Sequence, residues 1–177
     1  MNIYYTKTVL YAYANIDAVK EQIDDFVERK ALSSMSDYTP CIEQCESILN
    51  YTAQKIALIE LKEFVEKALS KLSPYELDCL DYKYFKKKPK EYYMDFDCES
   101  RGYFRRQVSL VKKVSEAFEN IGLTDEWFKK NLLTTNFFKE LLKRVEVQEK
   151  KNYKNKAKRQ KKRELEREND KVVKLTA

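Results

Sequence analysis

Residues 73–113, SPYELDCLDYKYFKKKPKEYYMDFDCESRGYFRRQVSLVKK, predict two short helices followed by a longer basic one. Ser73 is a hydroxyl N-cap, Pro74 suits the first helical position, and Glu76 places a carboxylate at N3, so these residues mark a helix start. Apolar side chains then recur at helical spacing and predict a helix with one apolar face. They are Leu77, Leu80, Tyr84 and Phe85.

Two further helices are predicted in the same stretch. Pro89 opens a short helix through Lys90–Met94, and Ser100 is a good N-cap for the third helix. One side of the third helix carries an apolar stripe, which we expect to be buried, made of Phe104, Val108, Val111, Val114 and Phe118. Its arginines and lysines belong mostly to the other faces. A helix that turns guanidinium groups outward suits the major groove of DNA, so the stretch predicts a helix-turn-helix.

The net charge of +6 is concentrated in two segments. Lys150–Arg163 contains nine Lys or Arg and no Asp or Glu, and Lys86–Lys113 contains nine against four acids. These segments together carry +14, which leaves the rest of the chain at −8. Such segregation is typical of a polyanion-binding surface. For the C-terminal segment, Lys150–Arg163, a helix face that is charged only because it is solvated is an equally good explanation.

Composition favours an all-α protein. Two glycines and three prolines in 177 residues are too few for a sheet-rich fold with many tight turns. No apolar run is long enough to span a membrane, and the N-terminal residues lack the basic start and cleavage site of a signal peptide. We therefore expect a soluble, cytoplasmic protein without membrane contact.

The cysteines and the absence of histidine argue against a metal site and against catalysis. Cys41 and Cys45 lie one helical turn apart, but the spacing of the four cysteines matches no common zinc module, and we expect small buried apolar residues instead. Without histidine there is no Ser-His or Cys-His nucleophile pair. Gly102 and Gly122 stand alone, so no glycine loop cradles a phosphate. We expect no catalytic residue, no metal and no cofactor.

The region before the motif, residues 1–72, is predicted to contain three helices. Residues 3–14 could form a strand or a helix, and helix is favoured, with tyrosines that pack in the core rather than stack on bases. Asn15 or Asp17 caps a helix to about Leu32. A long helix from residue 40 to 72 then keeps one face apolar, through Cys41, Cys45, Ile48, Leu49, Thr52, Ile56, Ile59, Leu61, Val65, Ala68 and Leu72. It should span two parts of the molecule or pair with another copy of the chain.

The motif spans residues 73–121. The region after it is divided into a helical hairpin over 122–147 and a basic tail over 148–177. Gly122 is placed to end the third helix, Thr124 starts another, and Thr135 or Asn136 starts the last. Beyond Val147 the apolar periodicity ends while helix-forming residues continue. The tail is therefore predicted to be an exposed helix, or disordered until it binds a partner.

The stretch from Leu72 to Lys113 resembles region 4 of bacterial sigma factors and the sigma-like helix-turn-helix proteins of phages and mobile elements. The matching segments are LSPYELDCLDYKYF, KEYYMDF and SRGYFRRQVSLVKK, which cover about a quarter of the chain. The resemblance implies that Ser100, Arg101, Arg105 and Arg106 face DNA, while Tyr103 or Phe104 locks the helix to its neighbours. This sequence departs from the family pattern at Asp97, where the family has a glycine, and at Glu99, which looks like an extra residue.

The leading hypothesis is a sequence-selective transcriptional regulator that binds double-stranded DNA, with RNA polymerase as a candidate second partner. Arg101 and Arg105 would read base edges, and Arg106 and Lys112 would hold phosphates. Tyr103 and Lys113 complete the predicted DNA-facing set. Non-specific phosphate contacts are predicted for Lys86, Lys87, Lys88, Lys150, Lys151, Lys154, Lys156, Lys158, Arg159, Lys161, Lys162 and Arg163.

Two other functions fit the same features. An architectural or packaging protein, similar to a small terminase subunit, would grip DNA with the motif and form a homo-oligomer through the helix at 40–72. A helical interaction protein would instead bind RNA or a protein partner, with the three predicted helices acting only as a packed bundle.

Overall fold

A computed structural model describes residues 1–33, 40–85 and 100–175, with side chains for these residues except Ser33, 100–104 and 156–175. In the described residues all regular structure is helical, which confirms the all-α prediction. The elements are α1 Ile3–Tyr13, α2 Ile16–Ser33, α3 Cys41–Leu69, α4 Pro74–Leu80, the π-helical turn η1 Asp81–Phe85, α5 Ser100–Asn120, α6 Asp125–Asn131 and α7 Asn136–Leu175.

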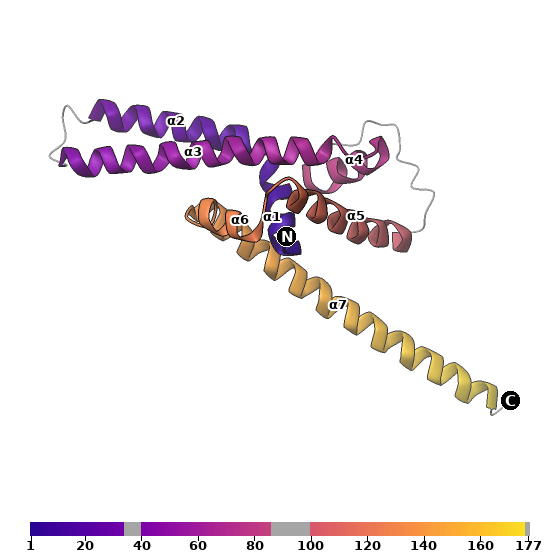
Figure 1. Ribbon diagram of the computed structural model, residues 1–177. Coiled ribbons are helices and arrows are strands. Elements are labelled where there is room, and N and C mark those ends of the chain that lie inside the picture. Colours follow the sequence, from indigo (N-terminus) through magenta and orange to yellow (C-terminus); the bar gives the residue numbers. More distant parts are fainter. Residues whose placement is uncertain (34–39, 86–99, 176–177) are drawn as a thin grey trace.

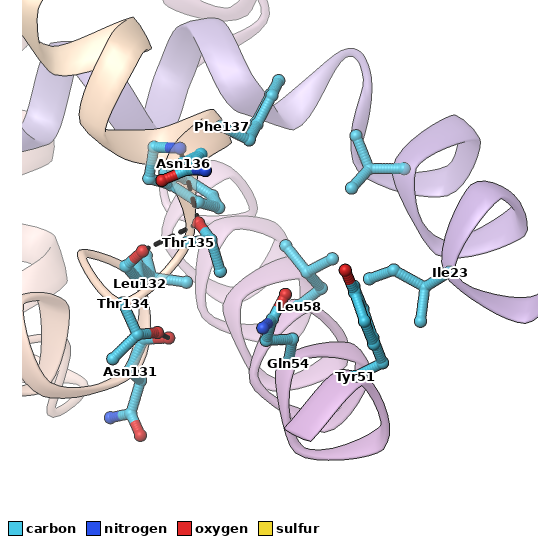
Figure 2. Close-up of a pocket in the computed structure, with 12 residues that line it drawn as sticks. Ile23, Tyr51, Gln54, Leu58, Asn131, Leu132, Thr134, Thr135, Asn136 and Phe137 are labelled. Carbon is cyan, nitrogen blue, oxygen red and sulfur yellow. Dashed lines mark hydrogen bonds between the residues drawn. The ribbon is translucent and has the colours of Figure 1, made fainter. Parts of the chain in front are cut away.

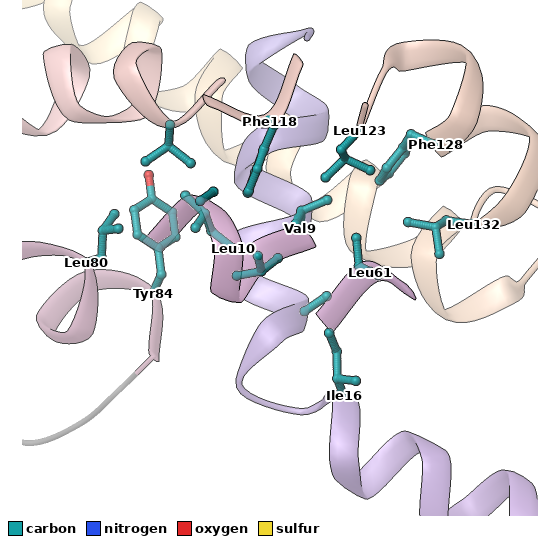
Figure 3. Packing of buried hydrophobic residues seen from close by; sticks show 14 of the residues in the cluster. Val9, Leu10, Ile16, Leu61, Leu80, Tyr84, Phe118, Leu123, Phe128 and Leu132 are labelled. Carbon is teal, nitrogen blue, oxygen red and sulfur yellow. The ribbon is translucent and has the colours of Figure 1, made fainter. Parts of the chain in front are cut away.

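The first helix, α1, lies at the centre of the molecule (Figure 1). Figure 3 shows its Val9 and Leu10 among Tyr84 of η1, Phe118 of α5 and Leu61 of α3, and all five side chains are buried. The helix is buried on more than one side because α3, α5, η1 and α7 all contact it. The preference for a helix over a strand in this segment is therefore confirmed.

Tyrosines of α1 pack inside the protein, as predicted. The ring of Tyr5 stacks on Phe128 with 4.5 Å between centroids, and the rings of Tyr11 and Tyr84 are 4.7 Å apart. Aromatic pairs at these separations add to the stability that burial alone provides. Tyr4, by contrast, is exposed.

Helices α2 and α3 form a hairpin that extends away from the rest of the molecule (Figure 1). Two ion pairs join the helices: Lys55 Nζ is 2.5 Å from a carboxylate oxygen of Asp24, and Lys62 Nζ is 2.7 Å from one of Asp17. Nearer its end, α3 buries Leu61 in the common core. With 29 residues it is about 44 Å long and spans two parts of the molecule, one of the two roles predicted for it.

The predicted apolar face of α3 is wrong from Cys41 to Ile59. Leu49, Ile56 and Ile59 are exposed, and so are Cys41 and Cys45, which we expected to be buried. The reason is that α2 packs against a different face of the helix. The α3 residues that are buried are Gln44, Ala57, Leu58, Leu61, Val65 and Ala68.

The predicted start of the 73–85 helix is confirmed, but its regular part is shorter than expected. The backbone N–H of Ser73 donates to Glu76 Oε2 over 2.9 Å, and the N–H of Glu76 donates to the Ser73 hydroxyl over 3.4 Å, which is a capping box. The α-helix ends at Leu80, and η1 follows as a π-helical turn. Leu80, at the end of α4, and Tyr84, within η1, are both buried, so the core continues across this change of helical geometry.

The helix boundaries predicted after the motif are also confirmed. Gly122 has a φ of 96°, a left-handed conformation that favours glycine, directly beyond the end of α5. Thr124 caps α6, because its hydroxyl accepts a hydrogen bond from the Trp127 N–H over 3.2 Å. The Thr135 hydroxyl does the same for the Phe138 N–H at the start of α7.

Helix α7 packs on the core only in its first part. Phe138 and Val145 are buried, and the Lys7–Glu149 ion pair of 2.8 Å ties α7 to α1. Beyond that pair the helix projects away from the body to Leu175, as Figure 1 shows. At 40 residues it is about 60 Å long. Among the described residues, no helix is both long and apolar enough to cross a membrane.

Candidate nucleic-acid interface

Helices α4 and α5, the first and third of the predicted motif, pack directly against each other. The buried Gln107 amide donates a hydrogen bond of 2.9 Å to the backbone carbonyl of Cys79. Around the start of α4 the two helices border an open hollow of about 430 Å³, lined by Ser73, Tyr75, Glu76, Cys79, Arg106, Ser109, Leu110 and Lys113.

The buried face of α5 differs from the prediction at one position. Val111, Val114 and Phe118 are buried as expected, but the Val108 side chain is 60% exposed, and Gln107 takes the buried position instead. Residues 107, 111, 114 and 118 follow the spacing of four and three that keeps side chains on one helix face. Val108 lies one residue, or about 100°, away from that face. Phe104 lies outside the described side chains.

An exposed stripe follows the side of α5 away from the core. Arg105, Val108 and Lys112 are all exposed, at spacings of three and four residues, so they lie on one face. Arg101 precedes Arg105 by four residues, although its side chain is not described. We call Arg105, Val108 and Lys112 the outward stripe. Its two charges belong to the predicted DNA-facing set, whereas the valine does not.

The remaining two described cations of α5 contact α4 instead. Arg106 donates a hydrogen bond of 2.6 Å to the Tyr75 hydroxyl, and its guanidinium lies 5.6 Å from the centre of the Tyr75 ring. Lys113 Nζ lies 2.8 Å from each carboxylate oxygen of Glu76. Both cations are still partly exposed to solvent, but their side chains are held at the flank of α5.

The pKa of the Glu76 carboxyl is lowered from its ordinary value. The largest cause is the hydrogen bond from Lys113, followed by that from the Ser73 backbone N–H. Both donors favour the charged carboxylate. The ionised Glu76 therefore connects the cap of α4 to the basic flank of α5.

Several predicted site residues lie outside the described residues or side chains. The segment 86–99 is not described, and it contains Lys86, Lys87, Lys88, the predicted helix at 90–94, Asp97, Cys98 and Glu99. Ser100, Arg101 and Tyr103 lie in the first turns of α5, where only the backbone is described. The structure thus describes the first and third helices of the predicted motif and leaves the second untested.

The basic tail belongs to the exposed part of α7. Lys150, Lys151 and Lys154 have exposed side chains. Further along only the helical backbone is described, at Lys156, Lys158, Arg159, Lys161, Lys162 and Arg163. In Figure 1 this part of α7 and the beginning of α5 both extend away from the α2–α3 hairpin. The beginning of α5 and the basic part of α7 therefore project from the core on the side opposite the α2–α3 hairpin.

A separate cavity of about 280 Å³ lies where the hairpin meets the α6–α7 connection. Figure 2 shows Tyr51, Gln54 and Leu58 of α3 on one side and the segment 131–137 on the other. The Thr135 hydroxyl in its wall donates to the Leu132 carbonyl over 2.9 Å. The lining residues are apolar or carry neutral amides and hydroxyls. This cavity therefore lacks the paired acid and base that hydrolytic chemistry uses.

Lys83 in η1 is a titratable group in an unusual environment that the sequence did not indicate. Burial lowers the pKa of its ammonium group, the nearby Lys7 lowers it further, and Glu149 partly opposes these effects. The Lys83 Nζ lies 5.1 Å from the centre of the Tyr84 ring. Lys7 lies in α1 and Glu149 in α7, so the charges that act on Lys83 come from segments far apart in the chain. Among the described residues, no cluster of three or more cysteines and carboxylates could hold a metal ion.

Comparison with known proteins found no match to a family model, to a curated protein or to a solved structure.

Proposed function

We propose that this chain is a sequence-selective DNA-binding transcriptional regulator that inserts α5 into the major groove, in the manner of a sigma region 4-like helix-turn-helix. The observation that carries the proposal is the outward stripe. It places two cations and one apolar side chain on a solvent-exposed face of α5, as a recognition helix presents such side chains to DNA. The proposal places the protein at the bacterial nucleoid, with RNA polymerase as a second partner.

The positions of the α5 side chains suggest separate roles. Arg105, with Arg101 one turn before it, would read base edges, because a guanidinium can bond two acceptors of guanine at once. Lys112 would contact a phosphate. Val108 lies between the two charges and would contact the methyl group of a thymine. Arg106 and Lys113 would mainly hold α4 against α5 and reach phosphates only at the edge of the interface.

The exposed part of α7 would add affinity without sequence preference. Nine cations between Lys150 and Arg163 face no acid within that segment. Lysine and arginine that neutralise phosphates release counterions, so their contribution decreases steeply as salt increases. In this proposal α5 determines which DNA sequence is bound, and the tail adds affinity that depends on salt but not on sequence.

Selection of duplexes from a random pool at near-physiological salt tests the proposed function. A regulator should enrich one motif, and Arg105→Ala should reduce that enrichment while leaving the protein folded. Lys139→Ala, at an exposed position of α7 outside both basic elements, is the matched control and should enrich the same motif as the wild type. Binding without any enriched motif would instead support an architectural role, and tight binding to structured RNA alone would reject the proposal.

An architectural or packaging role is the second candidate. It is favoured by the exposed apolar residues of α3, which offer a surface for assembly of several copies. Light scattering distinguishes the two roles, because a ring of many copies is expected for packaging and a monomer or dimer for regulation.

A further inference from the structure

The exposed side of α3 carries a heptad pattern. Six residues alternate at spacings of three and four: Ile42, Cys45, Leu49, Thr52, Ile56 and Ile59. All six are exposed, and the exposed fractions reach 74% for Ile42, 67% for Leu49 and 54% for Ile56. We call these six residues the α3 seam. Such a pattern, with apolar residues at positions a and d, is the one by which two helices pack as a coiled coil.

The rest of the molecule lies on other sides of α3. Helix α2 packs against the face that carries Tyr51, whose ring centroid is 4.1 Å from that of Phe26. The common core takes Leu61 and Val65. The seam therefore faces away from both, and it continues from the start of α3 to Glu63, an exposed residue that pairs with Lys67 and ends the apolar pattern.

The polar member of the seam is compatible with burial. The Thr52 hydroxyl donates a hydrogen bond of 2.9 Å to the carbonyl of Ile48 in the same helix. Its hydrogen bond is thus made within α3, and its methyl group can face an apolar partner. Burying a hydroxyl that already has its hydrogen bond costs little compared with burying an unsatisfied one.

We propose that a second copy of this chain packs in parallel along the α3 seam and forms a two-fold symmetric dimer. The charges beside the seam select this occupant and this orientation. Glu46 and Glu60 border one side, and Lys55 and Lys62 border the other. In a parallel dimer Lys55, at a g position, faces Glu60 at the following e position of the partner. Antiparallel packing sets e against e and g against g, so it does not form this opposite-charge pair.

Lys55 remains able to contact a second copy. It already pairs with Asp24 of α2, yet its side chain is still 32% exposed. An ammonium group has three donors, so a lysine can bond to a carboxylate of its own chain and to one of the partner. Lys55 of one copy would then approach Glu60 of the other, in the adjacent heptad.

The length of the seam sets the expected strength of the dimer. From residue 42 to 59 it extends about 27 Å along the helix. This is shorter than a long coiled coil, and the interface would be smaller than the roughly 1,600 Å² of a standard stable complex. A reversible, concentration-dependent dimer is therefore expected. The inference does not depend on DNA binding and is tested without DNA.

Sedimentation equilibrium measures the association over a range of about 1 to 200 μM. These concentrations suit a dissociation constant near the middle of that range. The wild type should pass from monomer to dimer, and Leu49→Glu combined with Ile56→Glu should weaken dimerisation by at least about 100-fold. The control is Val147→Glu combined with Tyr153→Glu, which places the same charges on exposed residues of α7. It should dimerise as the wild type does. A wild type that stays monomeric at every concentration, or a seam variant that dimerises normally, would overturn the proposal.

Cysteine cross-linking tests the parallel orientation. In a parallel dimer Cys45 lies at a d position opposite Cys45 of the partner, while Cys41 lies at the border. With copper-phenanthroline as a mild oxidant, the Cys41→Ser variant should form a disulfide-linked dimer at the Cys45 pair. Cys41→Ser combined with Cys45→Ser should not form that product. Equal yields from the two variants would reject the parallel arrangement.

Discussion

The guanidinium of Arg106 is bound to the side chain of Tyr75, the second residue of α4. The hydrogen bond to the tyrosine hydroxyl is 2.6 Å, and the guanidinium also lies over the ring. Its neighbour Arg105 is exposed on the outward stripe. Two consecutive arginines that look alike in the sequence therefore have different surroundings: Arg106 is held by a side chain of α4, and Arg105 lies on the outward stripe.

This difference predicts that the two alanine substitutions affect different properties, DNA discrimination for Arg105 and stability for Arg106. Arg105→Ala should reduce discrimination between a selected duplex and a scrambled one by about 1 to 3 kcal/mol and leave stability unchanged within about 0.5 kcal/mol. Arg106→Ala should lower the free energy of unfolding by about 0.5 to 1.5 kcal/mol, because alanine can form neither the hydrogen bond nor the cation–π interaction with Tyr75. Fluorescence anisotropy and urea unfolding measure the two quantities. Equal loss of discrimination in both variants would show that Arg106 also reads bases.

The exposed position of Val108 provides a test of the α5 register. Val108→Asp should leave the melting temperature nearly unchanged, since the side chain is already in solvent, and should greatly weaken DNA binding by placing a negative charge beside phosphates. Val111→Asp should unfold the protein, because it buries an unpaired carboxylate. Circular dichroism melts and a gel-shift series check both. If Val108→Asp also unfolded the chain, the outward stripe would be assigned to the wrong face.

The lowered pKa of Glu76 predicts how stability depends on pH. Because the pKa is lower in the folded protein than its ordinary 4.5, the ion pair with Lys113 stabilises the fold fully above that value. The contribution is lost as the pH falls through the lower, folded-state pKa. Urea unfolding at pH 6 and at lower pH should show the wild type losing more stability than Glu76→Gln. Parallel curves for the two proteins would mean that Glu76 does not contribute this acid sensitivity.

The exposed tail predicts a change in salt dependence. A chain that ends after Glu149 keeps the Lys7 ion pair and the buried part of α7, and it removes the nine cations between Lys150 and Arg163. The logarithm of its DNA affinity should fall less steeply with the logarithm of salt, by about 0.9 for each phosphate that the tail neutralises in the full chain. The preferred sequence should stay the same. An unchanged slope would show that the tail does not bind DNA.

Local rules predicted much of this fold correctly from the sequence. The capping box at Ser73, the left-handed glycine at 122 and the threonine caps before α6 and α7 each depend on a few neighbouring residues. Helix starts and stops are decided by backbone groups within one turn, so a sequence pattern can identify them. The segregation of positive charge was equally visible, because it needs only counting.

Predictions about which face is buried were less accurate. On α3 the sequence shows apolar residues on several sides, and only packing against α2 and the core decides which of them are covered. On α5 an exchange between Gln107 and Val108 shifts the buried face by one residue, because the Gln107 amide finds a hydrogen-bond partner in the backbone of α4. Apolar character alone cannot identify such a position, since a buried polar group is tolerated once it is hydrogen-bonded.

The order of residues along the chain was enough to establish that this protein is helical, where most of its helices begin and end, and where its charge lies. Folding in three dimensions was needed to hold Arg106 and Lys113 against α4, to turn Arg105, Val108 and Lys112 outward, and to leave a heptad stripe of α3 exposed. These two kinds of feature differ because helix formation follows from interactions within a turn or two. The choice of buried face depends on neighbours from distant parts of the chain, and these come together only on folding.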